Sequence, residues 1–183
     1  MSPRTDQRPR QANFFSFCHA CRNKCCAGAQ PPLTLRRRRV ILNFLQENNI
    51  DINAPFENGK YAFPRETDDG YCIFLDKISG ECRIHPVKPE TCVAGPITFD
   101  INVETGKITW FLKTSKICPL AGSLHKDRKA YRKHETSAKH EIRRLVRELD
   151  AEALRAILAI EEPDTIKVAE DDVGSEVLAK LKS

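Results

Sequence analysis

The stretch CHACRNKCC, residues 18–26, places four cysteines within nine positions. Two residues separate Cys18 from Cys21, so a tight turn can direct both sulfurs at one centre, and Cys25 follows one helical turn later. Cys26 is adjacent to Cys25, and adjacent side chains usually point in different directions. We therefore expect the first three cysteines at one metal or cluster, with Cys26 facing a second centre or joining ligands from elsewhere in the chain.

A second group of cysteines lies farther along the chain: Cys72, Cys82, Cys92 and Cys118. Thiolate is a soft ligand, and tetrahedral sulfur sites belong to zinc or to iron–sulfur clusters. Eight thiolates would complete two four-cysteine sites, although the spacing does not decide which distant cysteine closes which site. Three neighbouring cysteines with a fourth far along the chain are common at four-iron clusters, so a 4Fe-4S cluster is the expected cluster type. Zinc, as a redox-silent structural staple, is the alternative.

The rest of the sequence indicates the cellular compartment in which the thiols lie. The amino terminus has no apolar run of signal-peptide length, and nowhere do about 18 uncharged apolar residues occur in a row, as a membrane span requires. We therefore predict a cytoplasmic protein without a membrane segment. In a reducing compartment clustered thiols are more often metal ligands or redox groups than disulfides, and a disulfide framework would require an export route.

Outward from the first cysteines, the pattern predicts a helix and then loops. Residues 1–13 show no periodic apolar pattern and are expected to be flexible. Thr34 can cap a helix that ends near residues 48–49. Its apolar residues are expected on one side: Leu35, Ile41, Leu42 and Leu45. The segment 50–70 is rich in turn residues and is expected to be loop.

Two hairpins are predicted in the middle of the chain. The apolar run YCIFLD (71–76) and the segment CRIH (82–85) flank a tight turn, which brings Cys72 and Cys82 close together. The segments 96–103 and 107–113 alternate between apolar and polar residues and are joined by a short turn, which predicts the clearest strand pair.

A long helical stretch is predicted from Ser123 to a point before Pro163. Apolar residues recur every three or four positions along it, at 138, 142, 145, 149, 153, 157 and 160. This stripe is expected to pack on the cysteine-rich part; otherwise the helix 138–160 would be a surface for a protein partner. The last twenty residues are acidic and then weakly helical.

These elements predict a small α+β protein, a cysteine-rich metal-binding domain with short β-hairpins and a helical C-terminal extension. The predicted division is a flexible N-terminus (1–13), a cysteine-cluster metal-binding domain (14–122) and the helical extension (123–183). With 183 residues, the chain is long enough for one such domain and an extension.

The ordered cysteines also carry a family resemblance. Together with CIFLD (72–76), CRIH (82–85) and the Lys88-Pro89 pair before Cys92, they resemble the CxxCxxxCC cysteine-cluster family, described as zinc- or iron-chelating domain proteins. The resemblance covers roughly residues 14–122. It implies metal binding through the cysteines, with the identity of the metal open.

The chain departs from the usual family pattern at two places. That pattern has an aromatic residue where His85 stands and Arg-Pro where Lys88-Pro89 stands, which suggests a subgroup. Some larger relatives with a similar cluster look like protein lysine methylases. That activity is not carried over, because the eight glycines here are scattered singly and form neither a dinucleotide fingerprint nor a phosphate-cradling loop.

Other polar residues give weaker signals. His85 is a candidate second-shell donor or ligand, whereas His19 is expected in an exposed loop and His125, His134 and His140 on a solvated helix. The chain has a net charge of +5, and much of the positive excess lies in the basic runs 36–39 and 125–134. These runs could grip phosphates, but they are more simply solvated helix faces, because no nucleic-acid module accompanies them.

Three functional interpretations follow. The preferred one is a metal-binding protein that holds an iron–sulfur cluster or zinc through its clustered cysteines and serves as an electron carrier or an accessory to a redox enzyme. The alternative is a structural zinc module that docks on nucleic acid or a protein partner through its basic face. An enzyme whose cluster takes part in modifying a protein ranks lowest, because no catalytic motif is present.

Overall fold

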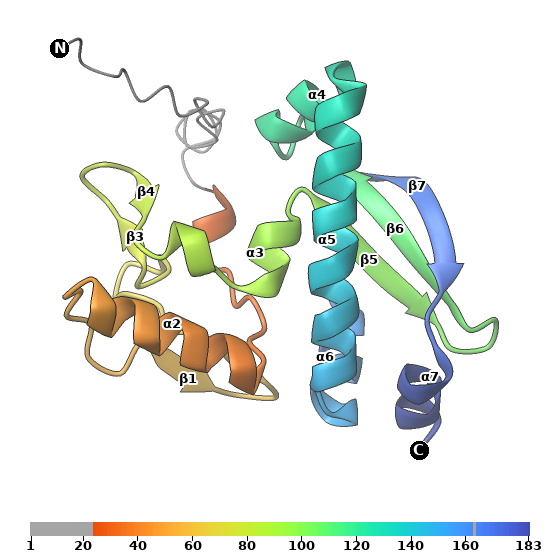
Figure 1. Ribbon diagram of the computed structural model, residues 1–183, viewed down its shortest axis with the longest axis horizontal. Helices are drawn as coiled ribbons and strands as arrows, with labels where there is room; N and C mark the ends of the chain where they lie inside the picture. The colour runs from red at the N-terminus through yellow and green to blue at the C-terminus, as the bar shows by residue number, and fades with distance from the viewer. Residues whose placement is uncertain (1–23, 163) are drawn as a thin grey trace, which may run out of the picture.

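In the computed structural model, which describes residues 24–162 and 164–183, helices and short antiparallel sheets alternate along the chain. This confirms the predicted α+β class with a helical C-terminal part. The flexible N-terminus predicted at 1–13 lies outside the described residues, as do Cys18, His19 and Cys21. Figure 1 shows two groups of elements, with α2 and the short hairpins on one side and a sheet covered by α5 on the other.

Helix α2 (Leu35–Glu47) begins directly after Thr34, as predicted, and the chain leaves it at Asn48. The residues of its core-facing side are spaced by four: Arg37, Ile41 and Leu45. Leu35 and Leu42 are 70% and 46% exposed, so the prediction that they share this side was wrong. On a helix of 3.6 residues per turn, Leu42 is rotated by about 100° from Ile41, which turns it out of the core.

The first core is small. Its buried hydrophobic members are Leu33, Ile41, Leu45, Phe74 and Ile84. Two short hairpins surround it: β1 (Phe56–Asn58) with β2 (Ala62–Pro64), and β3 (Leu75–Asp76) with β4 (Glu81–Cys82). The second hairpin confirms the pairing predicted for 71–85, whereas the first lies in a segment that the turn residues had indicated to be loop.

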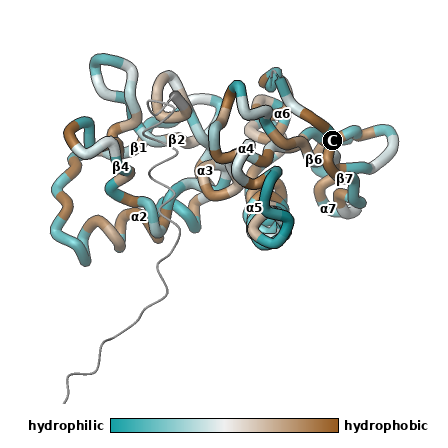
Figure 2. Tube along the Cα trace, turned by 90° about the horizontal axis from the view of Figure 1, so that it is seen from above, coloured by the Kyte–Doolittle hydropathy of each residue, from teal (hydrophilic) through white to brown (hydrophobic). Residues whose placement is uncertain are grey.

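The chain then crosses to the second core. A short 3-10 turn, η2 (His85–Val87), leads into helix α3 (Glu90–Ala94), which lies between the two groups of elements (Figure 2). Strands β5 (Ile97–Asn102) and β6 (Lys107–Lys113) follow as the predicted hairpin. They pair with Phe99 opposite Trp110, and the buried face of β6 is the predicted one: Ile108, Trp110 and Leu112.

A third strand, β7 (Thr165–Asp172), pairs with β6 and completes the sheet in the order β5-β6-β7. The sequence did not indicate this strand, because its acidic residues read as a polar tail. In the fold those acids have partners: Asp171 accepts a hydrogen bond from Trp110 Nε1 at 2.7 Å, and Asp172 lies 2.7 Å from Lys107 Nζ. Cationic neighbours therefore make an acidic segment compatible with a strand.

The single helical stretch predicted from Ser123 consists of separate helices: α4 (Pro119–Lys126), α5 (Arg128–Glu148) and α6 (Ala151–Leu158). The breaks fall at Asp127 and Asp150, whose carboxylates accept hydrogen bonds from the first N–H groups of the next helix. The weakly helical C-terminal segment forms α7 (Ser175–Lys182). None of the helices in the described part of the chain is long and apolar enough to span a membrane.

Most of the predicted stripe lies in the second core. Its buried members are Ala138, Ile142, Leu145, Leu149 and Ala153. They join residues of α3, the sheet and α7, so α5 packs on the part of the chain that carries the later cysteines, whereas Ile160 is exposed. This is the first of the two alternatives that the sequence left open. The second core contains residues from both sides of position 122, and the division of the chain into domains stays a prediction.

Candidate metal centre

Backbone pairing brings the first and second groups of cysteines together. The N–H of Cys72 donates to the carbonyl of Cys26 at 2.7 Å, and the N–H of Gly28 donates to the carbonyl of Gly70 at 2.8 Å. These bonds form an antiparallel bridge with Ala27 opposite Tyr71. The register therefore places Cys26 opposite Cys72, and opposed residues of an antiparallel pair have their side chains on the same face.

Cys72 lies three residues before β3, and Cys82 is the last residue of β4, where it pairs with Leu75. A turn follows each cysteine, and the N–H two residues later, from Phe74 or Ile84, donates a hydrogen bond to the cysteine sulfur and lowers its pKa. Burial outweighs this effect and raises the pKa of both thiols, that of Cys72 to about 11. N–H donors directed at sulfur stabilise thiolates and tune the metals that thiolates bind.

Helix α3 carries Cys92 to the same place. Burial raises the pKa of Cys92, and negative charge on Cys25, Cys82 and Cys72 raises it further, while Lys88 lowers it. Charges affect one another in this way only across short distances. Three separate segments of the chain thus bring their thiols into one neighbourhood.

The adjacent pair Cys25 and Cys26 lies in a short 3-10 turn, η1 (Lys24–Cys26). The hydrogen bond that the Cys26 thiol donates to Cys25 lowers the pKa of Cys25 to about 6, against the effect of burial. The same bond, burial and the neighbouring thiolates raise the pKa of Cys26 well above its usual range. Within the pair, the hydrogen bond therefore favours the thiolate at Cys25 over the thiolate at Cys26.

A lysine in the loop before α3 supplies positive charge to this neighbourhood. Lys88 lowers the pKa of Cys25, Cys82 and Cys92, and Lys113 adds a smaller effect on Cys25. In the sequence, Lys88 stood out only as part of a family pattern. Its charge, four positions before Cys92, was the signal that could have identified its role.

The predicted ligands are thus only partly assembled in the residues that the structure describes. Five of the six described cysteines influence one another, namely Cys25, Cys26, Cys72, Cys82 and Cys92, and all five are unbridged. Cys118 packs at the edge of the second core, directly before α4. Within residues 24–162 and 164–183, no three Cys, His, Asp or Glu side chains are arranged to hold a metal ion, so the ligand set stays a prediction.

The donor chemistry of these residues fits a soft or borderline metal. Clustered thiols that raise one another's pKa are destabilised as anions, and a bound cation removes that repulsion. Zinc and iron–sulfur clusters both take thiolate ligands, and the N–H bonds to Cys72 and Cys82 are the kind of support that such ligands use.

A buried polar network fixes α3, and with it Cys92. The Glu90 side chain is 0% exposed, accepts a hydrogen bond from Thr34 Oγ1 at 2.8 Å, and lies 3.5 Å from Arg37 Nε and 3.7 Å from Arg36. Arg37 also pairs with Glu141 on α5. The prediction that the basic run 36–39 is a solvated helix face was therefore wrong for Arg36 and Arg37, which link α2 to α3 and α5.

Two histidines lie near the centre. Burial and Lys88 lower the pKa of His85. His134 was expected to be solvated, but its Nε2 bonds to the carbonyl of Ala94 at 3.0 Å, two residues beyond Cys92, and burial lowers its pKa. The expectation was wrong because α5 packs its His134 side directly on α3.

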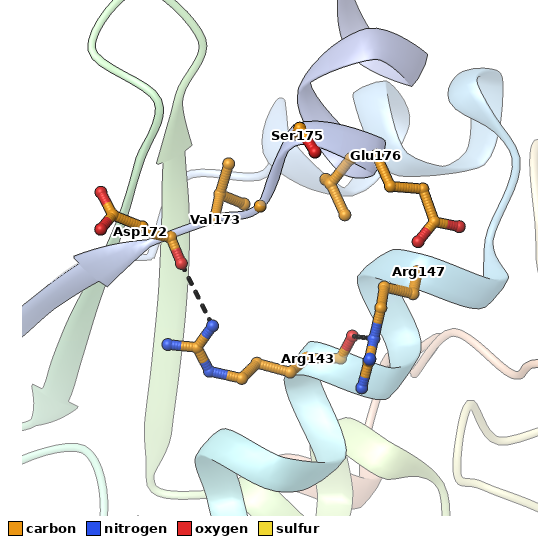
Figure 3. Close-up of a pocket in the computed structure, with 8 residues that line it drawn as sticks. Arg143, Arg147, Asp172, Val173, Ser175 and Glu176 are labelled. Carbon is orange, nitrogen blue, oxygen red and sulfur yellow. Dashed lines mark hydrogen bonds between the residues drawn. The ribbon is translucent and has the colours of Figure 1, made fainter.

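A pocket of about 380 Å³ lies away from the cysteines, where α5 meets the turn between β7 and α7 (Figure 3). Its lining residues are Arg143, Arg147, Asp172, Val173, Gly174, Ser175, Glu176 and Val177. Arg143 donates to the carbonyl of Asp172 at 3.1 Å, and Arg147 donates to the carbonyl of Arg143 at 3.0 Å. The first bond ties α5 to the C-terminal segment, the second lies within α5, and both concern the fold rather than the candidate metal centre.

Comparisons with known proteins agree with the cysteine pattern. The sequence model of the CxxCxxCC family, described as "Putative zinc- or iron-chelating domain", matches residues 17–119. An uncharacterised protein of Methanocaldococcus jannaschii is 31% identical over 97 residues, which cover 49% of this chain and 50% of that relative. The match thus spans about half the length of the relative. No solved structure matches this chain significantly.

Proposed function

This chain belongs to the CxxCxxCC family of zinc- or iron-chelating domains, and from that premise we propose that its clustered cysteines bind zinc or an iron–sulfur cluster. The ligands are drawn from Cys18, Cys21, Cys25, Cys26, Cys72, Cys82, Cys92 and Cys118. The observation that carries the proposal is the convergence of five thiols from η1, the β3–β4 hairpin and α3. A cytoplasmic location, where thiols stay reduced, is part of the proposal.

The metal also stabilises the N-terminal half of the fold. Among the residues that the structure describes, the first core has five buried hydrophobic residues, and its hairpins have strands of two or three residues. A core of that size contributes little stability by itself. Metal–thiolate bonds between η1, β3–β4 and α3 would supply the missing stabilisation, as structural zinc does in small domains.

Electron transfer follows only from the iron–sulfur form. A four-iron cluster accepts and donates single electrons when bound, whereas zinc is redox-silent. In that form the chain serves as an electron carrier or an accessory to a redox enzyme. Lys88 and the N–H groups of Phe74 and Ile84 would then favour the reduced state, because positive charge and hydrogen bonds to sulfur stabilise added negative charge.

Anaerobic purification with metal and sulfide analysis tests the proposal. Brown protein with iron and acid-labile sulfide supports the cluster, and colourless protein with stoichiometric zinc supports the structural form. Protein that takes up neither metal after reconstitution with each would refute the proposal.

Two variants of the same hairpin make the test specific. Cys82→Ser removes a proposed ligand, and Ile78→Ser changes a fully exposed residue at the hairpin tip. We expect the first variant to lose metal and the second to retain it. Equal metal content in both would exclude Cys82 from the centre.

A further inference from the structure

Glu66 lies beside Cys72 in an arrangement that the sequence did not indicate. The N–H of Thr67 donates to the carbonyl of Tyr71 at 2.7 Å, and the N–H of Ile73 donates to the carbonyl of Arg65 at 2.9 Å. These two bonds enclose an antiparallel bridge in which Glu66 is opposite Cys72. In this kind of pair the opposed residues exchange no hydrogen bond, their backbones approach most closely, and their side chains share one face.

The Glu66 carboxylate has a buried oxygen without a partner. Oε1 is inaccessible to solvent and finds no hydrogen-bond donor among the residues that the structure describes. An unpartnered buried polar atom is costly, and in native proteins such an atom commonly marks a missing water or ion.

Arg65, which precedes Glu66 in the sequence, does not donate to the Glu66 carboxylate. Arg65 donates to the carbonyls of Ala54 at 3.1 Å and Asn53 at 3.3 Å instead. Asp69, in the adjoining turn, pairs with Lys77. Arg65 and Asp69 thus have other partners, and the buried oxygen of Glu66 is left available to a bound cation.

We propose that Glu66 supplies a carboxylate oxygen ligand to the metal centre that Cys72 helps to form. The inference rests on the proposed function. Zinc and iron accept carboxylate oxygen together with sulfur. Because Cys26 lies opposite Cys72 on its other side, the three side chains form one row across three paired segments.

This row also assigns Cys26. Sequence spacing left open whether Cys26 faces a second centre or joins the later cysteines, and the register with Cys72 places it with the later group. Binding along the row requires side-chain rotation toward one point, since the described side chains do not form a closed shell.

Cobalt(II) titration of the full chain tests the proposal, because cobalt reports its ligands through its visible spectrum. Glu66→Gln keeps the shape of the side chain and removes the anionic oxygen. The matched control is Asp68→Asn, which removes a charge from an exposed residue of the same turn. Affinity is measured by competition with a chelator.

We expect Glu66→Gln to weaken cobalt binding by about tenfold or more and to shift the d–d bands, with the thiolate-to-cobalt charge-transfer band retained. Asp68→Asn should behave like the unaltered chain. A Glu66→Gln variant with unchanged affinity and an unchanged spectrum would overturn the inference while leaving the proposed function intact. If the unaltered chain shows no charge-transfer band, the proposed function itself fails.

Two further measurements separate the loss of a metal ligand from a change in the fold. Circular dichroism of the metal-free variants compares their folds. If Glu66→Gln alters the fold, Glu66→Asp replaces it, because this variant keeps the anionic oxygen on a shorter side chain. Retained cobalt binding with shifted d–d bands in Glu66→Asp supports ligation, and bands identical to those of the unaltered chain contradict it.

Discussion

Replacement of Arg37 by leucine should destabilise the fold more than any other change in the basic run 36–39. Glu90 is completely buried, and its partners are the hydroxyl of Thr34 at 2.8 Å and the guanidinium groups of Arg37 and Arg36 at 3.5 and 3.7 Å. Arg37→Leu removes the nearer, buried cation. The more exposed Arg36 remains and compensates the carboxylate only in part.

The expected loss of unfolding free energy follows from the Glu90 carboxylate, which stays buried without its nearer cation. Breaking a buried ion pair by removing one partner costs about 3–5 kcal/mol, because the other charge stays in the interior. The remaining hydroxyl and Arg36 favour the lower end of that range, about 3 kcal/mol. The lost pair with the partly exposed Glu141 adds at most about 1 kcal/mol.

Urea unfolding measured by circular dichroism gives the comparison. Arg39→Leu is the matched control, since Arg39 is exposed on the same helix, and its cost should stay within about 0.5 kcal/mol. A double variant, Arg37→Leu with Glu90→Gln, should recover stability relative to Arg37→Leu because no buried charge remains. Equal costs for Arg37→Leu and Arg39→Leu would refute the reasoning.

Three other predictions concern the sheet and the first core. Burial raises the pKa of Asp171, but hydrogen bonds from Trp110 and Lys139 outweigh burial and hold the pKa below its ordinary value. The ionised Asp171 therefore stabilises the fold fully above about pH 4, and this stabilisation is lost as the pH falls further. Asp171→Asn should flatten the acid limb of a curve of unfolding free energy against pH. Trp110→Phe removes the 2.7 Å bond to Asp171 and should cost about 1–3 kcal/mol in urea unfolding; a cost near zero would exclude that bond as a link to β7. Removal of metal by a chelator should speed amide hydrogen exchange in α2 much more than in α5, since only α2 belongs to the small first core; equal acceleration in both helices would contradict a local role for the metal.

Local patterns in the sequence predicted the elements that depend on their own residues. The β5–β6 hairpin followed from alternation, and the start of α2 followed from Thr34. Strand β7 could not be predicted in this way, because its acidic residues are stabilised by Lys107 and by Trp110 of β6, which are distant in the sequence. The breaks at Asp127 and Asp150 carried a capping signal that the longer apolar stripe obscured.

The candidate site, too, could be predicted from the sequence only in part. Cysteine spacing indicated which residues have metal-binding chemistry, but pairing across distant segments decides which of them meet. Cys26 is opposite Cys72, and Cys72 is opposite Glu66, through registers that no local pattern encodes. The buried position of Glu90 is likewise a consequence of how α2 packs on α3.

X-ray absorption at the metal K-edge of the purified, metal-loaded chain tests the central claim most directly, because it reports the atoms bound to the metal. The account predicts a first shell dominated by sulfur, at about 2.3 Å if the metal is zinc. A first shell made only of nitrogen and oxygen would contradict it.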